Sequence, residues 1–113
     1  MERKSLGFIE ITGVVAALDA LDIMTKSANV RLVSWERKLG GRLVTLIVTG
    51  EVAAVNVAVE NACKLAIKKP VAHLVLASPH EETWKLVEFS AKRLENKEEK
   101  KPQDIDGYQE THF

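Results

Sequence analysis

The sequence is poor in cysteine, proline and aromatic residues, and these shortages exclude some kinds of structure. Its 113 residues include one Cys, three Pro, two Trp, one Tyr and three Phe. The single cysteine, Cys63, cannot form an intramolecular disulfide, and no CxxC pair or Cys/His cluster offers ligands for structural zinc. We therefore expect one intracellular domain that is stabilised by aliphatic packing rather than by covalent or metal cross-links.

The chain also lacks net charge and long apolar segments. Sixteen basic residues balance sixteen acidic ones, so no overall field attracts nucleic acid or an anionic membrane. The balance conceals a division, because residues 1–93 carry 13 basic and 10 acidic side chains whereas residues 94–113 carry 3 and 6. No apolar run approaches the ~18 residues that a membrane-spanning helix needs. The composition predicts a soluble domain over residues 1–93 and an acidic, disordered tail over residues 94–113.

Aliphatic residues are abundant, and their spacing changes along the chain. Period-two alternation predicts strands at residues 5–11, 30–37, 43–49 and 71–77. Helical spacing predicts helices at residues 14–28 and 51–68, followed by a short C-terminal helix at residues 81–92. The order β-α-β-β-α-β is that of the α+β ferredoxin-like split βαβ fold, with four antiparallel strands and two helices on one face. The second face of such a sheet needs a further partner.

The connection between the second and third predicted strands carries the most information. It reads Lys38-Leu39-Gly40-Gly41-Arg42, a pair of glycines flanked by cations. Taken alone, this pattern is typical of a hairpin turn in which glycine supplies a positive φ. If several copies of the chain met around an axis here, their backbone N–H groups and cations would favour anions and polar metabolites.

Several short motifs resemble the domain of bacterial microcompartment shell proteins. They are LGFIE at residues 6–10, KSANV at 26–30, LVTLIVT at 43–49, GEVAAV at 50–55 and PH at 79–80. The resemblance implies the single-domain class whose cyclic homo-hexamers, with other shell proteins, tile a microcompartment in the bacterial cytoplasm. It also implies a metabolite pore on the six-fold axis and an edge that joins neighbouring hexamers. The residues so implicated are Lys38, Leu39, Gly40, Gly41 and Arg42 for the pore loop and Lys26 for the edge.

The chain departs from the family pattern in two places. Arg37 is one residue more than is usual before the glycine-containing connection, and Arg42 stands where a closing glycine is common. Ser78 stands where an arginine usually contacts the neighbouring hexamer. These departures leave two alternatives open. One is a non-hexameric, shell-associated adaptor of the same family, and the other is a free-standing ferredoxin-like regulator that binds a small molecule.

No motif points to catalysis, a metal or a cofactor. The sequence has no P-loop, GxGxxG, nucleophile elbow or HExxH pattern, so we expect a protein that is not an enzyme. Cys63 is interpreted as a small buried side chain, and His73 as a packed or interface residue. His80 and the two glutamates after it lack a third ligand at a recognisable spacing. The few apolar residues of the tail belong either to a disordered end or to a docking segment for encapsulated enzymes; they are Ile105, Tyr108 and Phe113.

Overall fold

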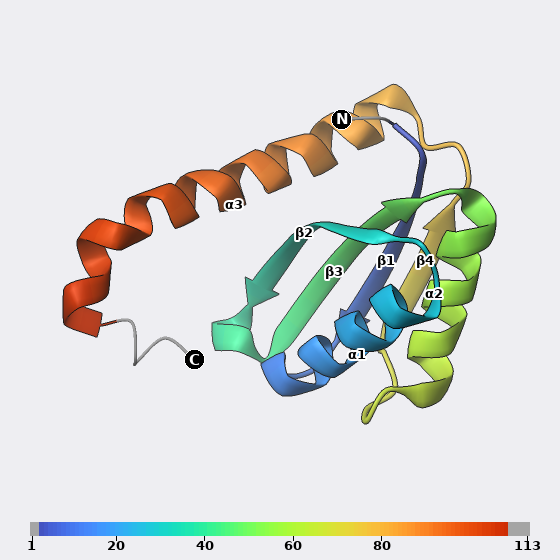
Figure 1. Cartoon of the computed structure of the whole chain (residues 1–113), viewed down its shortest axis with the longest axis horizontal. Helices are drawn as coiled ribbons and strands as arrows, with labels where there is room; N and C mark the ends of the chain where they lie inside the picture. Colours follow the sequence, from blue (N-terminus) through green and yellow to red (C-terminus); the bar gives the residue numbers. More distant parts are fainter. Residues whose placement is uncertain (1–2, 109–113) are drawn as a thin grey trace.

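Four strands and three helices follow one another in the predicted order, with one added turn of 3-10 helix. The computed structural model describes the backbone of residues 3–108 and the side chains of residues 3–96. The elements are β1 (Ser5–Ile11), α1 (Val14–Ser27), β2 (Arg31–Lys38), η1 (Leu39–Gly41), β3 (Leu43–Gly50), α2 (Val52–Leu65), β4 (Ala72–Leu76) and α3 (Glu81–Tyr108). Neighbouring strands are antiparallel in the order β2-β3-β1-β4 (Figure 1). The ferredoxin-like split βαβ arrangement is confirmed.

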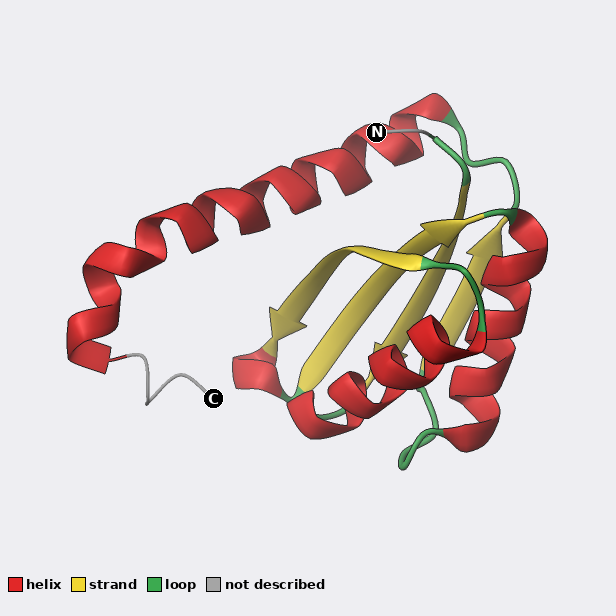
Figure 2. Cartoon of the chain, viewed as in Figure 1, coloured by secondary structure: helices red, strands yellow, loops and turns green. Residues whose placement is uncertain are grey.

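Helices α1 and α2 cover one face of the sheet (Figure 2). Alternate residues of the two central strands point to this face and are fully buried, among them Ile9 of β1 and Val48 of β3. Gly7 allows α2 to approach closely, because a Cβ at this position would lie 2.7 Å from Cγ1 of Val55. The larger core is therefore a thin aliphatic layer between the sheet and two helices.

The opposite face of the sheet is partly covered by the beginning of α3. Trp84 packs there against Leu6 and Ile47 and is only 1% exposed. Its indole Nε1 donates a hydrogen bond to the carbonyl oxygen of Lys4, 3.1 Å away. Helix α3 thus covers part of this second face, while Leu74 of β4 remains 51% exposed.

Helix α3 is much longer than the sequence pattern indicates. The short helix expected to end at residue 92 continues to Tyr108, a length of 28 residues. Glutamate and lysine dominate residues 94–101, and these are good helix formers even without an apolar stripe. Figure 1 shows α3 leaving the sheet and bending toward its C-terminal end. Its one proline, Pro102, removes a helical hydrogen bond in this part of the helix.

The tail predicted for residues 94–113 is therefore helical in its backbone as far as Tyr108. Of the three apolar residues considered for docking, Ile105 and Tyr108 lie in α3 and Phe113 lies outside the described residues. The division of the chain at residue 94 stays a prediction. Among the described residues, no helix has both the length and the apolar character required to cross a membrane.

Candidate functional site

The connection between β2 and β3 has an unusual backbone. Three consecutive residues have positive φ, which is 56° at Leu39, 68° at Gly40 and 92° at Gly41. Glycine adopts this region without steric cost, but leucine rarely does. The side chain of Leu39 is 68% exposed. An apolar side chain is thus held outward at the very end of the hairpin.

This connection is fixed against the start of α1. The N–H of Gly13 donates a hydrogen bond to the carbonyl oxygen of Arg42 over 3.1 Å. The backbone N–H and Nε of Arg42 both donate to the carbonyl oxygen of Leu39 over 3.3 Å. A Cβ on Gly41 would lie 3.3 Å from Cγ2 of Val14. The five residues predicted as a pore loop, Lys38 to Arg42, therefore share one defined structure whose outer surface is exposed.

The hairpin end presents mainly positive charge. Arg37, Lys38 and Arg42 are exposed, and the guanidinium of Arg37 lies 5.3 Å from the ring centroid of Trp35. The one acidic side chain in this segment, Glu36, forms an ion pair with an arginine of α3. Backbone N–H groups at a glycine-rich turn and nearby cations together suit an anion or a polar metabolite. The cations are evident in the sequence, whereas the partner of Glu36 is not.

Lys26, the predicted edge residue, lies in the last turn of α1, at the opposite end of that helix from the connection. Its Nζ is 2.9 Å from Oδ2 of Asp22, one helical turn earlier. The hydrogen bond to Asp22 raises the pKa of the Lys26 ammonium above its usual value. The side chain is exposed and charged, as an edge contact requires. Ser78, the other residue considered for the predicted edge, is also exposed.

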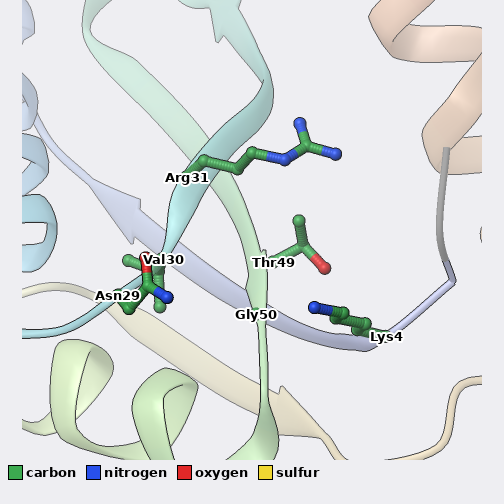
Figure 3. A pocket seen from close by; sticks show the side chains of 6 residues that line it. All are labelled: Lys4, Asn29, Val30, Arg31, Thr49 and Gly50. Atoms are coloured by element: carbon green, nitrogen blue, oxygen red, sulfur yellow. The ribbon is translucent and has the colours of Figure 1, made fainter.

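A hollow at the opposite end of the sheet was not anticipated from the sequence. It has a volume of about 140 Å³, is open to solvent, and is lined by Lys4, Asn29, Val30, Arg31, Thr49 and Gly50 (Figure 3). Figure 3 shows Lys4 and Arg31 on either side of Thr49. The Nζ of Lys4 lies 3.3 Å from Oε2 of Glu51. Because three separate segments form this hollow, no local pattern could have indicated it.

The cysteine and histidines do not form a metal site within the described residues, where no group of three potential ligands comes together. Cys63 is half-buried beside the main core, and its burial raises the pKa of the thiol. The Nδ1 of His80 accepts a hydrogen bond from the N–H of Glu82 over 3.0 Å, so His80 caps the start of α3. His73 is exposed on β4, at an edge of the sheet.

Comparison with known proteins identifies the family. The BMC-domain model matches residues 5–79. The chain is 40% identical over 89 residues to the bacterial microcompartment shell protein PduA of Citrobacter freundii, covering 77% of this chain and 95% of that protein. It is 48% identical over 81 residues to the carboxysome shell protein CsoS1A of Hydrogenovibrio crunogenus, covering 69% and 83%.

The fold agrees with a solved structure as well. A microcompartment protein from Desulfitobacterium hafniense superposes with a TM-score of 0.67 at 21% identity over 79% of this chain. This chain spans about half the length of that protein, 49%. The chain belongs to the BMC-domain family, whose members matched here are named as microcompartment and carboxysome shell proteins.

Proposed function

We propose that this protein is a structural shell component of a bacterial microcompartment in the cytoplasm. Six copies form a cyclic hexamer, hexamers join through edges that include Lys26, and the connection from Lys38 to Arg42 lines a central metabolite pore. No catalytic residue is assigned. The names of the relatives, which are shell proteins rather than enzymes, support this role.

The observation that carries the proposal is the geometry of the β2–β3 connection. It is held against α1 by the hydrogen bond from Gly13 to Arg42 and still presents Lys38, Leu39 and Gly40 to solvent. A flexible hairpin end would need no such support. Six rigid copies around an axis would give a ring of backbone groups and cations of defined width.

Exposed apolar side chains next to this connection support assembly. Val15 and Leu18, in the first half of α1, are 72% and 59% exposed. Val15 directly follows Val14, which contacts the position of Gly41, and Leu18 lies about one helical turn after Val14. Large aliphatic side chains grouped on one face commonly mark a subunit interface, and obligate interfaces bury more than ~2,000 Å² in total.

Light scattering tests the oligomer directly. A cyclic hexamer should give a particle of six 12.5-kDa chains at micromolar concentration, and electron microscopy should show six-fold rings or sheets. A monodisperse monomer would refute the hexamer. Val15→Glu should prevent assembly while leaving the monomer folded by circular dichroism, and Thr25→Glu, on an exposed polar position of the same helix, is its control.

Arg42→Glu tests the pore assignment. It places six acidic groups on the axis in place of six basic ones and should abolish binding of small anions such as inorganic phosphate by the hexamer. Lys69→Glu makes the same charge change in an exposed segment far along the chain and is the control. Equal phosphate affinities for the two variants would contradict a pore lined by Arg42.

A second candidate is a non-hexameric adaptor attached to the shell. The length of α3, which continues well past the sheet, is the observation that favours it (Figure 1). An adaptor would use this helix to reach another shell protein or an encapsulated enzyme. A stable monomer or dimer that co-assembles with shell proteins would support the adaptor over the hexamer.

A further inference from the structure

The first half of α3 is bonded to β2 just before the connection. Nη2 of Arg93 lies 2.8 Å from Oε1 and 2.7 Å from Oε2 of Glu36, so a short ion pair joins α3 to the sheet. The hydroxyl of Ser90 also donates to Oε2 of Glu36. Ser90 in turn lies 2.6 Å from the hydroxyl of Ser34, which is almost completely buried. One carboxylate therefore accepts hydrogen bonds from two residues of α3.

The side chain of Arg93 also contacts an aromatic ring of α3, which helps to orient it toward Glu36. Its guanidinium carbon lies 5.7 Å from the ring centroid of Phe89, one turn earlier on α3. An arginine held over an aromatic ring loses less side-chain entropy when it forms an ion pair. Phe89, Ser90 and Arg93 thus form a clamp on Glu36, which we call the α3 clamp.

The α3 clamp decides which charges remain at the hairpin end. Glu36 and Lys38 are two residues apart on one strand, so their side chains leave the same face of the sheet about 7 Å apart. A glutamate released from Arg93 would be close enough to pair with Lys38. Because Glu36 pairs with Arg93, the three cations of the hairpin end have no carboxylate partner among the described side chains; they are Arg37, Lys38 and Arg42.

We infer that Arg93 of α3 is a residue that determines the selectivity of the pore, because it holds Glu36 away from the cations of the β2–β3 connection. Arg93 acts through Glu36 and does not itself line the connection. The ligand class is a small anion, with inorganic phosphate as the simplest probe. The inference rests on the proposed hexamer and pore and adds to them that α3 sets the charge of the pore.

The test compares phosphate binding, by isothermal titration calorimetry at low ionic strength, with particle mass by light scattering on the same samples. Arg93→Gln should weaken phosphate binding by about tenfold or more, because six carboxylates become available to six cations at short range. Arg3→Gln is the matched control. It removes the same charge and another ion pair of α3, that between Arg3 and Glu88 at 3.0 Å, without touching Glu36.

A double variant distinguishes an effect of Arg93 on the selectivity of the pore from an effect on the attachment of α3 to the sheet. Glu36→Gln combined with Arg93→Gln should restore the affinity for phosphate, because no carboxylate is then released, and Arg93→Lys should retain most of it. If Arg93 only attached α3 to the sheet, the double variant would bind phosphate as weakly as Arg93→Gln. That outcome would overturn the inference even if the particle is a hexamer. Equal phosphate affinities for Arg93→Gln and Arg3→Gln would overturn it as well. A wild-type particle that is not a hexamer would overturn the proposed function instead, and the inference with it.

Discussion

Replacing Gly41 with alanine should destabilise the protein more than the same change at Gly40, its neighbour. Both glycines have a left-handed backbone, with φ of 92° and 68°, and that region costs other residues about 1–2 kcal/mol. A Cβ on Gly40 meets no atom within 4 Å, whereas one on Gly41 would press on Val14 at 3.3 Å. We expect the free energy of unfolding to fall by about 1 kcal/mol for Gly40→Ala and by about 2 kcal/mol for Gly41→Ala.

Urea unfolding followed by tryptophan fluorescence measures both changes. Because assembly contributes stability that depends on concentration, all variants are compared at one protein concentration and again at a lower one. In a Val14→Ala background the difference between the two alanine variants should shrink to a few tenths of a kcal/mol, since the close contact is gone. Equal losses at the two glycines, or a difference that survives Val14→Ala, would refute packing of the connection against α1.

Three further predictions concern the edge, the main core and α3. Lys26→Ala should change the free energy of unfolding by no more than about 0.5 kcal/mol, yet reduce extended sheets in electron micrographs, whereas Lys64→Ala, at another exposed helical lysine, should leave sheets intact. Gly7→Ala should cost at least about 2 kcal/mol, because α2 must move away from the sheet, and an unchanged urea midpoint would contradict the close approach. The hydrogen bond from Arg3 holds the pKa of Glu88 below its usual value. Their ion pair therefore stabilises the fold above the ordinary glutamate pKa, and this contribution is lost as the pH falls through the lowered one; Arg3→Gln should flatten the acid end of a stability profile, and identical profiles would argue against the pair.

Local patterns sufficed for the element order because strand and helix periods are properties of short segments. The alternation that ends before Lys38 and resumes after Arg42 placed the hairpin connection to within one residue, because β2 includes Lys38, and the two glycines indicated the positive φ of the connection. The left-handed backbone of Leu39 could not be foreseen, because it depends on how the connection is held against α1. The roles of Lys26 and of the pore loop were predicted from the family resemblance and not from periodicity.

The missed features depend on residues that are distant in the sequence. Glu36 and Arg93 are 57 positions apart, and nothing near either residue indicates the other. The extent of α3 was underestimated because apolar periodicity was required for a helix, whereas the residues after Leu94 favour helix by intrinsic propensity. Cys63 was expected to be buried and is half-buried beside the core, a difference that leaves its interpretation as a packing residue unchanged.

Helix α1 has one end at the connection and the other at the proposed edge. Its first residue contacts the position of Gly41 and its last turn carries Lys26, so 12 residues, about 18 Å at 1.5 Å each, separate the two places. In the proposed hexamer, α1 is a rigid link that runs outward from the rim of the pore to the seam between neighbouring hexamers. The spacing of a shell lattice would then depend in part on the length of this helix, which stretches very little. A force on the seam would be transmitted along α1 to the rim of the opening, so that strain in a curved shell and the width of its pores would be mechanically linked.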